Sequence, residues 1–170
     1  MAKIGRRGRL WLRSFHILFV GSWIGVGISE ILVLLSSGNA TDGSALNTYY
    51  AVDKVLNPIV KSFGLLAIIT GVLLAWLTPW GFFKHKWVIY TIIVVILDIL
   101  IAGIWCVPAI NKMAALAGAE GLSALQNPEY MSARNTAIIS GLVPLLLLIS
   151  AVFVSVMKPW RKREGAEPAA

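Results

Sequence analysis

Thiol and imidazole groups are scarce in this chain, and their scarcity excludes several kinds of chemistry. The 170 residues include one cysteine, Cys106, and two histidines, His16 and His85. A single cysteine excludes an intramolecular disulfide and a thiolate metal cage, so we interpret Cys106 as a small apolar residue. The sequence also contains no glycine-rich phosphate loop, paired-histidine protease motif or nucleophile elbow. We therefore assign no catalytic residue and no metal site, and we favour a protein that is not an enzyme.

Charged residues are also few. Only 14% of the residues are charged, whereas 58% are hydrophobic. Soluble domains average about a quarter charged and about half apolar residues, and so few polar side chains would not cover a soluble core. The composition therefore predicts an integral membrane protein. No organelle-targeting segment is recognisable, which favours the bacterial plasma membrane.

Four long apolar runs fit this interpretation. They cover residues 11–36, 56–79, 87–108 and 136–157. Each reaches the roughly 20 residues that a helix needs to cross the hydrocarbon core, and an open sheet would leave its backbone unsatisfied in lipid. Pro79 and Pro108 are expected to end the second and third helices. We predict an all-α fold, in which residues 1–170 form one polytopic domain, a bundle of four transmembrane helices.

Basic residues are distributed unevenly around these runs. Eleven precede or lie at the start of the first run, lie between the second and third, or follow the fourth: Lys3, Arg6, Arg7, Arg9, Arg13, Lys84, Lys86, Lys158, Arg161, Lys162 and Arg163. Only Lys54, Lys112 and Arg134 lie in the two longer connections, residues 37–55 and 109–135, which we interpret as outer loops. The positive-inside rule then places both termini in the cytoplasm. The cations are expected to contact anionic lipids of the inner leaflet, without a nucleic-acid partner.

Polar and small residues recur at helical spacing within the runs. The stripes are Arg13, His16, Val20, Trp23, Gly27, Glu30 and Leu34; Asn57, Lys61, Gly64, Ile68, Gly71, Ala75 and Thr78; Trp87, Thr91, Val94, Asp98, Ile101, Trp105 and Pro108; and, more weakly, Ser140, Pro144 and Ser150. Spacings of three and four residues fall on one helix face, so we expect these stripes to meet inside the bundle. The glycine pairs Gly21 with Gly25 and Gly64 with Gly71 predict close helix packing.

Three charged residues lie on these stripes: Glu30, Lys61 and Asp98. A charge at the centre of a membrane helix costs about 2.5–3.5 kcal/mol on insertion scales, so these groups must pair, lose their charge or line water. We predict an intramembrane cluster in which Lys61 keeps one carboxylate ionised while the other carries a proton. The alternative is a structural ion pair that fixes the register of the helices.

Two segments resemble known bacterial membrane families. The sequence FHILFVGSWIG, residues 15–25, is similar to the first helix of copper-resistance-D-like proteins and of the heme-binding, four-helix type of protoporphyrinogen oxidase. The sequence TPWGFFKHKWVIYTIIVVI, residues 78–96, resembles a signature of uncharacterised four-helix bacterial membrane proteins. The first resemblance implies that His16 is a heme ligand. The simpler alternatives are a hydrogen-bonding role for His16 and a place for His85 in the basic loop.

Three functions are compatible with these features. The first is a non-enzymatic accessory or transport-related membrane subunit that needs no cofactor. The second is a heme-binding membrane redox protein that uses His16. The third is a small transporter coupled to protons or cations, which would require a homo-oligomer because four helices are few for a transport pathway.

Overall fold

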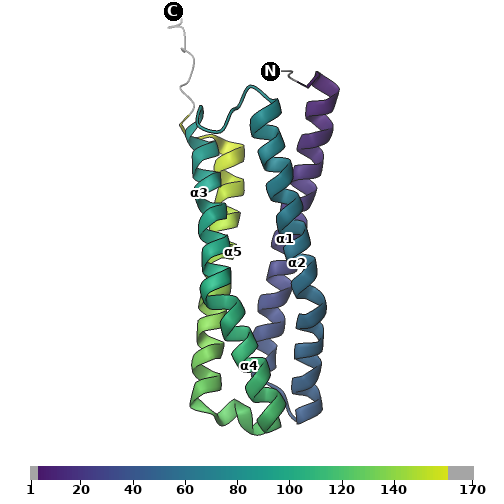
Figure 1. Cartoon of the computed structure of the whole chain (residues 1–170), viewed down its shortest axis with the longest axis vertical. Helices are drawn as coiled ribbons and strands as arrows, with labels where there is room; N and C mark the ends of the chain where they lie inside the picture. Colours follow the sequence, from purple (N-terminus) through teal and green to yellow (C-terminus); the bar gives the residue numbers. More distant parts are fainter. Residues whose placement is uncertain (1–3, 161–170) are drawn as a thin grey trace, which may run out of the picture.

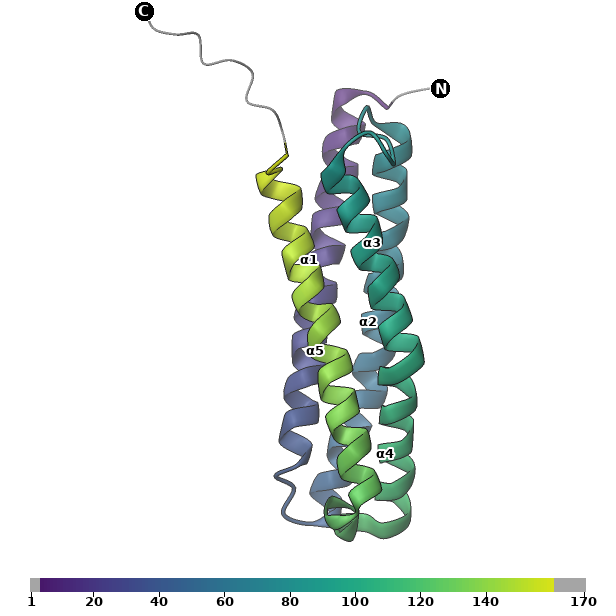
Figure 2. The same cartoon turned by 90° about the vertical axis from the view of Figure 1, so that its left-hand side faces the viewer.

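The computed structural model of the protein describes residues 4–160, and its long helices run side by side along one axis (Figures 1 and 2). The elements are α1 (Arg6–Ser37), α2 (Gly43–Leu77), α3 (Lys86–Ile101), the π-helix η1 (Ala102–Cys106), α4 (Val107–Glu120), the 3₁₀-helix η2 (Gly121–Gln126) and α5 (Pro128–Met157). Because α3 continues through η1 into α4 and η2, these elements form four helices that are long and apolar enough to cross a membrane. The described residues contain no strand, so the prediction of an all-α fold is confirmed.

Helix α1 packs mainly on α2, and α5 packs on α3 and α4 and also touches α1. The first and last described residues lie at the same end of the bundle (Figure 1). There the Ile4 amide donates to the Leu77 carbonyl at 3.4 Å, and the Lys158 ammonium lies over the Trp80 and Trp87 rings.

We call this end the basic end, and the end formed by residues 38–42 and 121–127 the far end. The described cations of the basic end are Arg6, Arg7, Arg9, Arg13, Lys84, Lys86 and Lys158. Lys3, Arg161, Lys162 and Arg163 lie outside the described residues.

The two longer connections are mostly helical, so the expectation of loops at residues 37–55 and 109–135 was wrong. Helix α2 begins at Gly43 because the Asp42 carboxylate accepts the Ala45 N–H at 2.8 Å. The Ser44 hydroxyl also donates to Asp42, and these hydrogen bonds hold the pKa of the Asp42 carboxyl below its usual value. Asn127 caps α5 in the same way by accepting the Glu129 N–H at 2.8 Å.

Pro108 does not end the third long helix, contrary to the sequence-based expectation. The π-helix η1 immediately precedes it, and Pro108 occupies the first turn of α4. A proline removes one backbone donor and clashes with the preceding turn, and a wider turn relieves both effects. The wider turn also rotates the inward face by about one residue. Trp105 and Pro108 are therefore exposed, whereas Ala109 and Met113 are buried.

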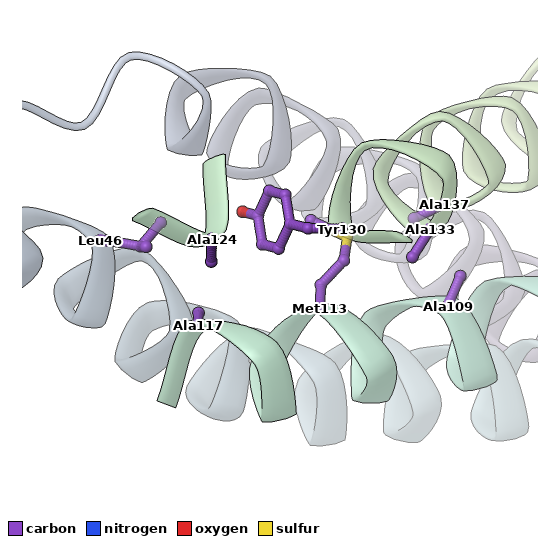
Figure 3. Packing of buried hydrophobic residues seen from close by; sticks show 8 residues of the cluster. All are labelled: Leu46, Ala109, Met113, Ala117, Ala124, Tyr130, Ala133 and Ala137. Carbon is purple, nitrogen blue, oxygen red and sulfur yellow. The ribbon is translucent and has the colours of Figure 1, made fainter. Parts of the chain in front are cut away.

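Two apolar clusters fill the interior. The far-end cluster joins α2, α4, η2 and α5 through Leu46, Ala109, Met113, Ala117, Ala124, Tyr130, Ala133 and Ala137 (Figure 3). Its alanines allow close approach of the helices, and the phenol of Tyr130 accepts a hydrogen bond from Tyr50 at 2.8 Å. The central cluster joins α1, α2, α3 and α5 through Trp23, Ala67, Val94, Leu148 and Ala151. These two clusters leave a polar region between them.

The two glycine pairs noted in the sequence differ in their surroundings. Gly64 and Gly71 of α2 pack against α1, because a Cβ atom added at Gly64 would lie 3.0 Å from the Trp23 ring and one at Gly71 would lie 3.1 Å from the His16 ring. Gly21 and Gly25 lie on the exposed face of α1, and no described atom comes within 4 Å of a Cβ added there. Gly21 and Gly25 therefore do not pack against the described residues of this chain, and their role in close helix packing stays a prediction.

The contact of Gly64 with Trp23 can be tested by adding one methyl group. We expect Gly64→Ala to lower the free energy of unfolding, because overpacking costs about 1–3 kcal/mol and exceeds the gain in helix propensity, which is at most about 1 kcal/mol. The control is Gly118→Ala on the exposed face of α4, where the added Cβ meets no atom within 4 Å and stability should rise or stay constant. Thermal unfolding in detergent measures both, and an equal shift for the two variants would contradict this packing.

Candidate functional site

The polar region between the two clusters contains a cavity of about 140 Å³, which we call the acidic cavity. Trp23 and Leu148 of the central cluster bound it on one side, and Met113 and Ala137 of the far-end cluster bound it on the other. All four long helices contribute to its wall. Its polar lining residues are Glu30, Ser37, Tyr49, Tyr50, Asp53, Asp98, Cys106 and Ser140.

Two of the three charged residues predicted from the stripes lie in this cavity. Asp98 comes from α3 and is only 8% exposed, and Glu30 comes from α1. The Glu30 Oε1 atom is buried and has no hydrogen-bond partner among the described residues. Within residues 4–160 the one salt bridge joins Lys112 to Glu129 at 2.8 Å, so neither cavity carboxylate has a cation within ion-pair distance. The bundle thus holds Glu30 and Asp98 without a counter-charge in contact.

Lys61 does not join them. Its side chain lies on the exposed face of α2, and Val60 instead lines the cavity. Gly64, Ala75 and Thr78 of the same stripe are buried, so the stripe follows the inward face of α2, but the Lys61 side chain at its edge is exposed. Lys61 acts on Glu30 only through space, alongside the like charge of Asp53. Glu30 and Asp98 share a cavity, Lys61 forms no ion pair with either among the described residues, and the predicted cluster around Lys61 stays a prediction.

Asp53 is the cavity carboxylate that the sequence interpretation missed. It lies on α2 seven residues before Val60, and both line the acidic cavity. The residue was overlooked because residues 37–55 were interpreted as a loop. Extending the Asn57 stripe back by one helical turn would have found it. Asp53, Glu30 and Asp98 come from three helices and are spread around the wall, and the described residues contain no group of three His, Cys, Asp or Glu side chains placed to hold a metal ion.

The only cysteine of the chain also lines the cavity. Cys106 belongs to η1, and Ala102 of the same π-helix lies beside it in the wall. Without the extra residue of the wide turn, the side chains after Asp98 would follow the expected stripe through Trp105, which is exposed. The π-helix therefore sets which residues of the third long helix face the cavity. Single π turns inside α-helices occur frequently at functional sites.

His16 lies in the contact between α1 and α2. Its Nδ1 atom is 3.1 Å from the Ala67 carbonyl oxygen and 3.0 Å from the Thr70 hydroxyl. A carbonyl only accepts hydrogen bonds, so Nδ1 carries the proton and Nε2 holds the lone pair of the neutral ring. This tautomer suits a metal ligand, whose other ring nitrogen usually donates to a carbonyl.

The surroundings of His16 fit a heme poorly. Its ring faces Gly71, and His16 does not line the acidic cavity or the second cavity described below. The contacts that the structure shows are those of a residue that holds two helices together. The other histidine, His85, precedes α3 at the basic end and stacks on Trp87 with 6.2 Å between ring centroids. The assignment of His16 as a heme ligand stays a prediction.

Comparisons with models of protein families, with curated proteins and with solved structures found no match to this chain. The resemblances noted for residues 15–25 and 78–96 therefore stay predictions, and the candidate site rests on its own geometry.

Substitution of Lys61 tests whether its side chain contacts the carboxylates of the acidic cavity. Because its side chain is exposed and forms no ion pair within residues 4–160, we expect Lys61→Met to change the free energy of unfolding by less than about 0.5 kcal/mol. The comparison variant is Leu46→Ala in the far-end cluster, where loss of a fully buried side chain should cost about 2–5 kcal/mol. Thermal unfolding in detergent distinguishes the two. A loss at Lys61 as large as that at Leu46 would restore the predicted cluster.

Proposed function

We propose that the protein is a bacterial inner-membrane protein that binds and exchanges a proton or another small monovalent cation at the acidic cavity. The observation that carries the proposal is the position of Glu30, Asp53 and Asp98 around one cavity, where no cationic side chain of residues 4–160 pairs with them. We propose no enzymatic activity, because transfer of a cation requires binding groups and access but no covalent chemistry.

The cost of buried charge supports a cation as the ligand. An ionised carboxylate that leaves water without a partner loses hydration that a low-dielectric interior does not replace. Breaking a buried ion pair typically costs about 3–5 kcal/mol for this reason, and three carboxylates around one cavity also repel one another. A proton or a monovalent cation relieves both costs when it binds, so the cavity favours positively charged ligands.

The size of the cavity supports a small ligand. At about 140 Å³ it is smaller than the roughly 300–1,000 Å³ of pockets that enclose drug-sized molecules. A single water needs only about 10–15 Å³ by the same kind of measure, so several waters fit beside a small cation. Hydroxyls of Tyr49 and Ser140 line the same wall and supply polar contacts for such waters.

The two clusters separate the cavity from the ends of the bundle. The central cluster lies toward the basic end, and the far-end cluster lies toward residues 38–42 and 121–127. Exchange of a cation therefore requires one cluster to open, and we assign the opening to the far end. The wide turn of η1 lies in the wall on that side, where Cys106 meets the cavity. We propose a homo-oligomer, because four helices are few to enclose a transport pathway.

Proton transfer can be measured after purified protein is reconstituted into liposomes that contain a pH-sensitive dye. With a potassium gradient and valinomycin, we expect internal pH to change faster than in empty liposomes. Glu30→Gln and Asp98→Asn should each slow this change about tenfold, because they remove the charge that attracts the cation.

The matched control is Glu129→Gln, which makes the same change at a residue whose side chain is 67% exposed and outside the cavity. Its rate should stay within about twofold of the original. Repetition with a sodium gradient and a sodium-sensitive dye distinguishes the two cations, because a pH-sensitive dye does not report sodium entry. A sodium signal without a change of internal pH identifies sodium as the ligand. A rate equal to that of empty liposomes under both conditions would contradict the proposed function.

The proposed orientation places the basic end in the cytoplasm, because the positive-inside rule depends on lysine and arginine close to the helix ends. Reporter fusions at Gly43 and Gly118, toward the far end, should be active on the outer side. A fusion at His85, at the basic end, should be active in the cytoplasm. A reporter at His85 that is active outside would reverse the orientation.

A further inference from the structure

A second cavity, of about 270 Å³, lies at the basic end between the start of α1 and the end of α2. We call it the basic cavity. Arg6, Arg9 and Arg13 of α1 line it together. Spacings of three and four residues place these arginines on one face of the helix, whereas Arg7 falls on another face. All the basic residues at this end are expected to determine topology and to contact anionic lipids, but among residues 4–160 only these three arginines line the cavity.

The positive charge of the basic cavity has no carboxylate to balance it among residues 4–160. All described acidic residues lie in the middle of the bundle or toward the far end: Glu30, Asp42, Asp53, Asp98, Glu120 and Glu129. The single described salt bridge, between Lys112 and Glu129, belongs to the far end. The three guanidinium groups therefore face a cavity that lacks an anion from this part of the chain.

Apolar side chains share the lining with the arginines. Leu10 of α1 is exposed and Leu74 of α2 is buried, and both line the cavity. The Thr78 hydroxyl already donates to the Leu74 carbonyl at 2.6 Å, so it does not need a ligand as its acceptor. Trp80 completes the wall, and indole rings favour the boundary between membrane and water. The basic cavity thus combines guanidinium groups with apolar side chains at the expected level of lipid headgroups.

We infer that the basic cavity binds the phosphate group of an anionic phospholipid from the leaflet at the basic end. Guanidinium groups bind phosphate oxygens through paired, charge-assisted hydrogen bonds, and three of them on one helix face surround a single phosphate. The glycerol and the first acyl carbons would then contact Leu10 and Leu74. Free inorganic phosphate shares the anionic chemistry but would leave these apolar side chains exposed to water. This site is independent of the acidic cavity and of the proposed cation exchange.

Native mass spectrometry of the purified, delipidated full chain in detergent tests this inference by titration with phosphatidylglycerol, phosphatidylcholine and inorganic phosphate. We expect one phosphatidylglycerol to bind with a dissociation constant at least about tenfold lower than that of phosphatidylcholine, because the headgroup of the latter carries a compensating cation. Inorganic phosphate should not displace the lipid. Displacement by inorganic phosphate at equal concentration would overturn a lipid as the ligand.

The variant with Arg6→Gln, Arg9→Gln and Arg13→Gln should weaken binding of phosphatidylglycerol about tenfold or more. The control carries Arg7→Gln, Lys84→Gln and Lys86→Gln, which remove the same charge from the same end outside the cavity lining. The control should lose less than about threefold. An equal loss in both variants would show diffuse attraction and overturn the site. Arg9→Gln alone keeps the test valid if the triple variant does not fold, and it too should bind more weakly than Arg7→Gln.

Discussion

The carboxylates of Glu30 and Asp98 are held inside a bundle whose outer surface is mostly apolar. Charged groups in such surroundings are costly unless a counter-charge, a proton or water reaches them. The helices do not supply a cation in contact, because Lys61 faces outward and the described salt bridge lies at the far end. The structure therefore buries two carboxylates without a cation in contact. Binding of a proton or another cation, as proposed, would neutralise their charge.

The packing of the helices determines where these carboxylates lie. Gly64 and the alanines of the far-end cluster let the helices approach closely above and below the acidic cavity, so the carboxylates are separated from both ends of the bundle. The π-helix η1 rotates the third long helix so that Cys106 faces the cavity while Trp105 faces outward. Close packing and a local irregularity thus act together. The first isolates the cavity, and the second sets the side chains that line it.

The sequence predicted the parts of the fold that depend on the length of apolar runs. Four apolar helices and the inward positions of Trp23, Asp98 and Ser140 follow from run length and helical spacing, since lipid leaves no other way to satisfy the backbone. The helical far end was missed, although Asp42 and Asn127 are residue types that cap helices. Their capping effect extends the helices past the apolar runs, where hydrophobicity gives no signal.

The candidate site was predicted only in part, for two physical reasons. Val60 and Lys61 are adjacent, and the face that points inward depends on how α1 packs against Gly64, which spacing alone does not determine. Asp53 lies in the capped extension of α2 and therefore outside the run that defined the span. The wide turn before Pro108 added a further shift, because a proline signals a disturbance of the helix but not whether the helix ends or widens.

Cys106 provides the most direct measurement of the central claim, that the acidic cavity favours cations when it opens to water, because it is the only cysteine of the chain and lines this cavity. The measurement is the rate at which a cationic and an anionic methanethiosulfonate reagent of similar size modify this thiol. The ratio of the two rates, divided by the same ratio for a small free thiol in solution, cancels the intrinsic reactivity of both the thiol and the reagents. The account predicts that this normalised ratio favours the cationic reagent about tenfold and that Asp98→Asn lowers it, whereas Glu129→Gln does not. A normalised ratio of one, or a ratio unaffected by Asp98→Asn, would contradict an acidic cavity that attracts cations.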